Sequence, residues 1–118
     1  MFPLVLLLAV GVSDQDANAA VMYVQSYVTP ALFEVCKSAT PKRAAEFDTV
    51  LANWQAKNKD VVARGEAVAR EQAKRDGTDV DKMFAEERDS MVHELEALTK
   101  VEQQKRCESL LQATRAEQ

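Results

Sequence analysis

The sequence has little of what several protein classes require. Its 118 residues include only three glycines, three prolines, two cysteines and one histidine, and aromatic residues make up 6%. So few glycines and prolines exclude collagen-like chains and Pro/Gly-rich disordered chains. Three scattered glycines also cannot form a glycine-rich phosphate-binding loop. The formal net charge of −4 gives no basic surface, so we expect no nucleic-acid partner.

The shortage of histidine and cysteine also argues against a metal site or an enzyme. A structural zinc site needs about four ligands. A di-iron bundle needs two Glu-x-x-His pairs, whereas the residue three positions before His93 is Ser90. We interpret the acidic residues around His93 as a solvated helix face: Glu86, Glu87, Glu94 and Glu96. We therefore predict no catalytic residue, no metal ligand and no cofactor.

What the sequence does contain favours helices. Ala, Glu, Gln, Lys and Arg are plentiful, and such side chains lose little freedom in a helix. No stretch alternates apolar and polar residues with a period of two, so we expect no strand. A chain of this length forms one domain. We therefore predict an all-α fold, a small bundle of about four helices.

The first residues read as a leader rather than as part of the fold. Residues 2–12 form an apolar run, which as a helix would span only about 16 Å, too short for a membrane anchor. The run suits the hydrophobic region of a secretory signal, and the small-x-small sequence Ala-Asn-Ala ending at Ala19 suits signal peptidase. We predict a cleaved signal peptide over 1–19 and a periplasmic or secreted domain over 20–118, without a membrane anchor. Because no Lys or Arg precedes the apolar run, a buried N-terminal helix is the alternative.

The two cysteines agree with export. Cys36 and Cys107 both lie in the predicted mature domain, and an even number of cysteines in a small exported domain indicates a disulfide. Their separation of seventy-one positions excludes a Cys-x-x-Cys redox motif. In the chain-entropy model, closing so long a loop stabilises the fold by about 4 kcal/mol.

Helix start and stop signals divide the predicted domain into four segments. Thr40 precedes Pro41 as an N-cap before a first-turn proline, and Gly77 suits a left-handed C-cap. Thr99 and Glu102 form a capping box. The segments run over about 20–38, 41–75, 79–98 and 99–114. Pro30 inside the first segment either kinks that helix or begins a new one.

The second segment is the longest and carries a heptad-like seam. Its seam residues alternate spacings of four and three: Phe47, Leu51, Trp54, Asn58, Val61, Gly65, Val68 and Gln72. As one helix it would be about 52 Å long. The disulfide must bring the first and last segments together. We expect a continuous central helix, with the fourth segment running toward its start; the alternative is a break at Asn58 or Gly65.

A continuous central helix would leave part of the bundle thin. The hairpin over residues 61–95 would then be only two helices thick, and two helices cannot bury both faces. We predict that this thin region presents a surface for a protein partner or a second copy of the chain. The surface consists of Val61, Val62, Gly65 and Val68.

Several short stretches carry a resemblance to known proteins. They are the leader ending in Ala17-Asn18-Ala19, the stretch Pro30-Ala31-Leu32-Phe33-Glu34-Val35-Cys36, Trp54, Arg64-Gly65-Glu66 and Arg106-Cys107-Glu108. With them the chain resembles small exported (periplasmic) all-helical proteins of Gram-negative bacteria over most of its predicted mature part. The resemblance implies a periplasmic location and assigns no functional residue. The architecture is also similar to that of some immunity proteins against secreted bacterial toxins.

These observations predict a non-enzymatic periplasmic binding or interaction protein, for example a toxin-neutralising or envelope-associated factor. The alternative is a structural or stress-related periplasmic protein without a dedicated partner. An enzyme or a metal carrier is a third reading, which the missing catalytic and ligand motifs disfavour.

Overall fold

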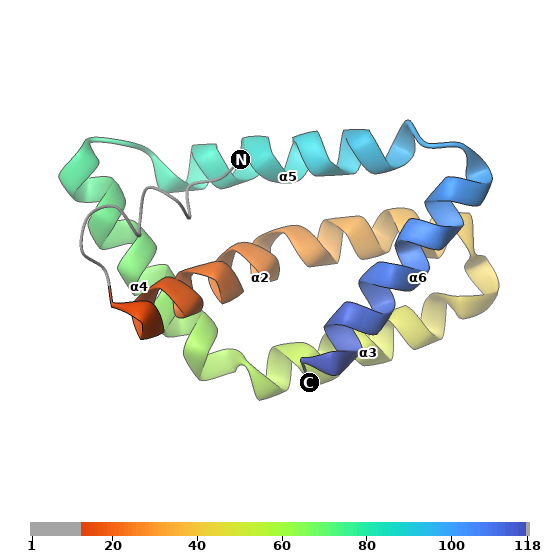
Figure 1. The fold of residues 1–118 in the computed structure, drawn as a ribbon, viewed down its shortest axis with the longest axis horizontal. Coiled ribbons are helices and arrows are strands. Elements are labelled where there is room, and N and C mark those ends of the chain that lie inside the picture. The colour runs from red at the N-terminus through yellow and green to blue at the C-terminus, as the bar shows by residue number, and fades with distance from the viewer. Residues whose placement is uncertain (1–12, 118) are drawn as a thin grey trace.

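The computed structural model describes residues 13–117, which form five α-helices and one short 3-10 helix and contain no strand (Figure 1). In chain order the elements are α2 (Asp14–Ala39), η1 (Pro41–Arg43), α3 (Ala44–Lys57), α4 (Lys59–Asp76), α5 (Val80–Glu96) and α6 (Lys100–Ala116). The all-α prediction is confirmed. The number of helices differs from four because the segment predicted over 41–75 is divided.

Helix α2 is the central element of the fold. It contacts every other described helix, and it lies between α5 on one side and α3 and α4 on the other (Figure 1). The helix begins at Asp14, where the side chain of Ser13 accepts the backbone N–H of Asp16 at 3.1 Å. Pro30 lies inside α2 and does not end it. The helix thus starts six residues before the predicted mature N-terminus, and the predicted cleavage bond after Ala19 lies within it.

The expectation of one continuous central helix is wrong, and the alternative break at Asn58 is right. Helix α3 ends at Lys57 and α4 begins at Lys59. The side-chain amide of Asn58 donates to the carbonyl of Trp54 at 2.9 Å and to that of Glu117 at 3.1 Å. The break is therefore held by a side chain that bonds one helix end and the end of the chain together.

Helix α6, the fourth predicted segment, runs alongside α3 in the same direction. The prediction had it run the opposite way, toward the start of the second segment. Ion pairs and hydrogen bonds join Arg43 to Glu108 near the start of α3 and Asn58 to Glu117 at its end. The two helices therefore run in the same direction, and α6 crosses α2 on the way (Figure 1). The expected direction of the fourth segment is wrong because the spine is not straight.

The predicted caps at Gly77 and Thr99 are confirmed, but the predicted N-cap at Thr40 is wrong. The hydroxyl of Thr40 donates to the carbonyl of Cys36 at the end of α2, and the next α-helix begins only at Ala44, after η1. Gly77 takes the left-handed conformation at the end of α4, with φ of 70°. The carboxylate of Asp79 accepts the backbone N–H of Lys82 at the start of α5. Thr99 and Glu102 form a complete capping box at the start of α6.

Two clusters of buried side chains make up the core. The first surrounds the disulfide and contains Val28, Leu32, Phe33, Cys36, Phe47, Val50, Leu95, Cys107 and Leu111. The second joins α2, α4 and α5 and contains Tyr23, Ala69, Ala73, Val80 and Phe84. Val24 packs against both clusters. The hairpin of α4 and α5 is thus covered by the first half of α2.

Candidate functional site

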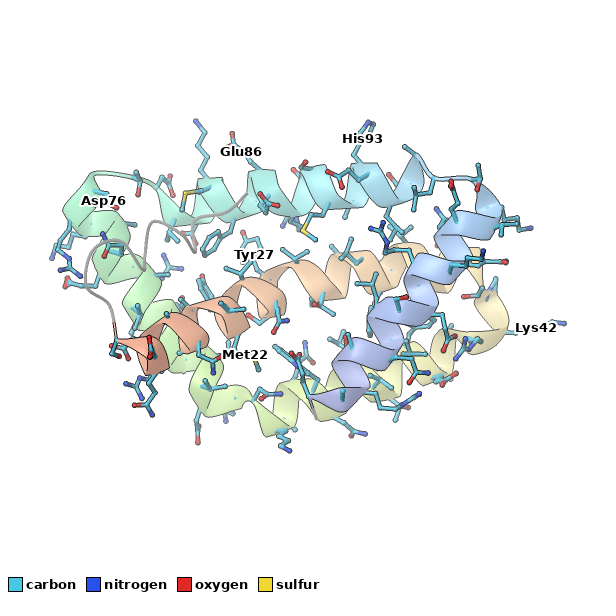
Figure 2. The ribbon with its side chains drawn as sticks, viewed as in Figure 1. Met22, Tyr27, Lys42, Asp76, Glu86 and His93 are labelled. Atoms are coloured by element: carbon cyan, nitrogen blue, oxygen red, sulfur yellow. A yellow bond between two sulfur atoms is a disulfide. The ribbon has the colours of Figure 1, made fainter. Side chains whose placement is uncertain are left out.

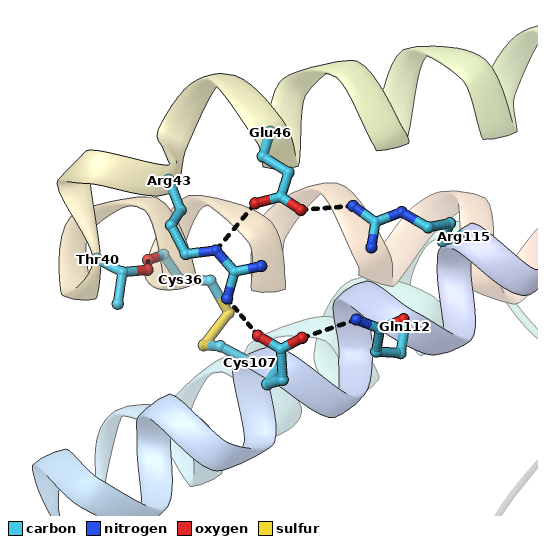
Figure 3. Close-up of polar contacts among 8 residues, drawn as sticks. Cys36, Thr40, Arg43, Glu46, Cys107, Gln112 and Arg115 are labelled. Carbon is cyan, nitrogen blue, oxygen red and sulfur yellow. Dashed lines mark hydrogen bonds and ion pairs between the residues drawn. A yellow bond between two sulfur atoms is a disulfide. The ribbon is translucent and has the colours of Figure 1, made fainter.

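The predicted disulfide is confirmed. Cys36 near the end of α2 and Cys107 in the middle of α6 are bonded, with their Cα atoms 5.6 Å apart (Figure 3). Both side chains are fully buried, and both belong to the first core cluster. A bond that is closed off from solvent in this way has a structural role, because redox-active cysteines need to be accessible.

A chain of charged side chains lies beside the disulfide (Figure 3). Glu46 accepts hydrogen bonds from Nε of Arg43 at 2.9 Å and from Nη2 of Arg115 at 2.5 Å, and Arg43 also donates to Glu108. These bonds, that from Arg43 first, lower the pKa of Glu46 to about 2. Hydrogen bonds from Gln112 and then Arg43 lower the pKa of Glu108. Each group is satisfied by a neighbour, so the network joins η1, α3 and α6 and offers no free acid or base.

The four residues of the predicted partner surface all lie in α4 but differ in their surroundings. Gly65 is buried against the backbone of Ala19 in α2. Val62 packs against the second core cluster. Val61 and Val68 are half-buried. Intramolecular packing against α2 therefore engages Gly65 and Val62, and the partner surface remains a prediction for Val61 and Val68.

The polar residues considered for chemistry are dispersed. His93 is exposed, and its side chain points outward from α5, as does that of Glu86 two turns earlier in the same helix (Figure 2). Asp76 lies at the far end of α4, where its carboxylate accepts from the amide of Gln72. Within residues 13–117, no group of three or more His, Cys, Asp or Glu side chains could hold a metal ion.

A half-enclosed apolar groove lies along α2 and is the strongest candidate for a binding site. It has a volume of about 250 Å³, and its lining is predominantly apolar. Six lining residues share one face of α2, and one each comes from α5 and α6: Val21, Val24, Gln25, Val28, Thr29, Leu32, Met91 and Leu110. The floor of the groove is thus α2, which is held in the middle of the fold.

One residue that lines the groove, Gln25, also has a buried side-chain oxygen without a described hydrogen-bond donor. Oε1 of Gln25 is closed off from solvent, and no described residue donates a hydrogen bond to it. An unsatisfied buried carbonyl is unfavourable, because the group loses its hydrogen bonds to water.

The sequence analysis did not predict the groove. Val21, Val24, Val28 and Leu32 recur with the spacing of one apolar helix face, and this spacing does not distinguish a covered face from an open one. Val28 and Leu32 are indeed core residues, but Val21 and Val24 stay half-buried. Two features of the sequence could have indicated an open face. Gln25 interrupts the apolar face, and the aromatic residues of α2 lie on a second face, which packs against α5.

Comparisons with known proteins give no family for this chain. No protein-family model, no curated protein and no solved structure matches it. Over the part of the chain that the structure describes, no helix is both long enough and apolar enough to span a bilayer.

Proposed function

We propose that the protein is a non-enzymatic binding protein of the periplasm or the secreted space, and that its binding site is the apolar groove along α2. The groove carries the proposal: it is a half-enclosed space of about 250 Å³ whose lining is predominantly apolar. Concave and mostly apolar sites are typical of small-molecule binding, and this groove lies just below their usual volume of about 300–1,000 Å³.

The architecture supports a rigid site. The disulfide fixes the end of α2 to α6, and Asn58 fixes the end of α3 to the end of the chain. The other helix that flanks the groove, α5, packs directly on α2, which forms its floor. A binding site held on packed helices needs little ordering when its ligand arrives.

The disulfide also supports the compartment. Disulfides persist in oxidising environments such as the bacterial periplasm and are rare in the cytosol. The apolar run at 2–12 and the Ala-Asn-Ala sequence ending at Ala19 supply the matching export signal. Intact-mass analysis of the exported protein tests this part: the mass of residues 20–118 with one disulfide supports export and the predicted cleavage.

Binding of an environment-sensitive apolar dye tests the groove. We expect one dye per folded chain, detected by enhanced fluorescence. Thr29→Trp places a large side chain in the groove and should weaken dye binding at least tenfold. Val101→Trp is the matched control, because Val101 is an exposed apolar residue outside the groove.

The proposal fails if the folded wild-type protein binds no dye, or if the two tryptophan variants bind it equally. Near-ultraviolet circular dichroism confirms that each variant is folded. Should Thr29→Trp fail to fold, Val21→Trp blocks the same groove from its half-buried end.

A further inference from the structure

The bond after Ala19, at which the sequence predicts cleavage, lies inside a packed helix. Helix α2 begins ahead of it, and the start of α2 lies beside α4 (Figure 1). Ala19 and Ala20, on either side of the bond, are only 0% and 1% exposed. Cleavage there would therefore remove residues 14–19 from a helix that is part of the fold.

Residues 13–19 make specific contacts with the rest of the protein. The side chain of Ser13 caps α2 by accepting the backbone N–H of Asp16 at 3.1 Å. The carboxylate of Asp16 accepts a hydrogen bond from Nε of Arg64 in α4 at 2.8 Å, across forty-eight positions of the chain. Ala17 is buried. All of these contacts would be missing from a protein cut after Ala19, so they indicate that the segment belongs to the exported fold.

Gly65 of α4 gives the clearest sign that Ala19 is retained. Glycine inside a helix is unfavourable, because its backbone loses the most freedom on folding. The two atoms nearest to a Cβ built on Gly65 both belong to Ala19: the carbonyl oxygen at 1.9 Å and the carbonyl carbon at 2.5 Å. The close approach of α2 at Ala19 thus explains the glycine. A chain that starts at Ala20 lacks both atoms, and only the contact with the Cβ of Tyr23 remains.

Packing also explains the small residues that suggested cleavage after Ala19. Ala17 and Ala19 are both buried, where a larger side chain would have to displace its neighbours. The Ala-Asn-Ala sequence therefore has a structural reason that is independent of signal peptidase.

A second small-x-small sequence, Ala9-Val10-Gly11, lies ahead of the described residues. The apolar residues before it, 2–8, number seven, which falls within the roughly 7–15 residues of a signal hydrophobic region. A cut after Gly11 would leave Ser13, and with it the N-cap of α2, in the mature chain.

We propose that the export signal is cleaved after Gly11, so that the mature protein begins at Val12 and retains the whole of α2. Signal peptidase hydrolyses this peptide bond: the carbonyl carbon of Gly11 takes the hydroxyl of a water molecule, and the nitrogen of Val12 takes the proton. The assignment rests on the export in the proposed function. It revises only the position of the cut, because that function needs export and not a particular bond.

The intact mass of the protein purified from the periplasm of a bacterial expression host tests the assignment. We expect the mass of residues 12–118 with one disulfide. Gly11→Leu places a bulky side chain directly before the cut, where signal peptidase requires a small residue, and should lower the amount of this product at least tenfold. Val10→Leu is the matched control, because the middle position of a small-x-small site accepts large residues, and it should yield as much product as the wild type.

The possible results separate this assignment from the proposed function. A periplasmic wild-type protein of residues 20–118, or one with any start other than Val12, would overturn the assignment and leave export in place. Equal amounts of the 12–118 product from Gly11→Leu and Val10→Leu would also overturn it. An uncleaved chain found only in the cytosol would overturn both the assignment and the exported location. Absence of dye binding by the 12–118 chain would overturn the binding groove and leave the assignment intact.

Discussion

The Cα of Gly65 in α4 faces the backbone of Ala19 in α2 so closely that no side chain fits between them. A Cβ placed on Gly65 would lie 1.9 Å from the carbonyl oxygen of Ala19 and 2.9 Å from the Cβ of Tyr23. Ala17 and Ala20, beside this contact, are also buried. Small residues on both helices thus allow α2 and α4 to approach along what is the most extensive helix contact of the fold.

Gly65→Ala should therefore destabilise the protein, although alanine is the better helix former. The new methyl group would have to push two backbones apart, and overpacking of this kind costs about 1–3 kcal/mol. The reduced propensity of glycine would offset only about 1 kcal/mol of that. Urea unfolding, followed through the buried Trp54, measures the change.

Gly77→Asn is the matched control for that substitution. Gly77 has a positive φ of 70°, which asparagine tolerates, and its built Cβ meets nothing within 4 Å. We expect its unfolding midpoint to stay close to that of the wild type. An equal loss of stability in both variants would contradict the close contact between Gly65 and Ala19.

The start of the processed chain should influence stability. A chain that starts at Ala20 lacks the Ser13 cap, the buried side chain of Ala17 and the ion pair between Asp16 and Arg64. Loss of a helix cap alone costs about 1 kcal/mol. We expect the chain of residues 20–118 to unfold at lower urea concentration than the chain of residues 13–118. Equal midpoints would mean that the first turn of α2 adds nothing to the fold.

The same pair of chains gives a second readout for Gly65→Ala. In the chain that begins at Ala20 the carbonyl oxygen of Ala19 is missing, so the most severe obstacle to the new methyl group disappears. The contact with Tyr23 remains. We expect Gly65→Ala to be clearly less destabilising in the shorter chain than in the longer one, which a double comparison of unfolding midpoints measures.

Loss of the disulfide should be the most damaging single change to the scaffold. The bond closes a loop with a sequence separation of 71, for which chain entropy gives about 4 kcal/mol. Cys36→Ala with Cys107→Ala should lower the unfolding free energy by up to that amount. Alkylation of the denatured wild type before and after reduction checks the bond: two thiols should react only after reduction.

The sequence contained enough information for most helix boundaries, because these depend on local signals. The caps at Gly77 and Thr99 lie where their residue types predicted them, whereas that at Thr40 does not. The pairing of Cys36 with Cys107 followed from their number and the export signal. The residue types at the caps and the number of cysteines were sufficient in these cases, because neither prediction depends on how the helices cross.

The arrangement of the helices depended on contacts that no local pattern announces. Asn58 lies on a heptad-like seam whose spacing continues past it, and its side chain also bonds the carbonyl of Glu117, fifty-nine positions away. The prediction could identify Asn58 as a candidate but not choose it over Gly65. The groove could not be predicted for the same reason. Whether Val21 and Val24 are covered depends on where α5 and α6 pack on α2.

The ion pairs beside the disulfide should make stability depend on acid pH. Hydrogen bonds from Arg43 and Arg115 lower the pKa of Glu46 to about 2, below its ordinary value of 4.5. Because the folded-state pKa is the lower one, the ionised Glu46 contributes stability above about pH 4.5, and this contribution is lost as the pH falls toward 2. Glu46→Gln should therefore unfold more easily than the wild type at pH 7, and the difference should shrink between pH 4.5 and 2.

Glu94→Gln is the control, since Glu94 is exposed and forms no ion pair with residues 13–117. Urea midpoints measured across this range check the prediction, and a gap between Glu46→Gln and wild type that stays constant down to pH 2 would contradict it.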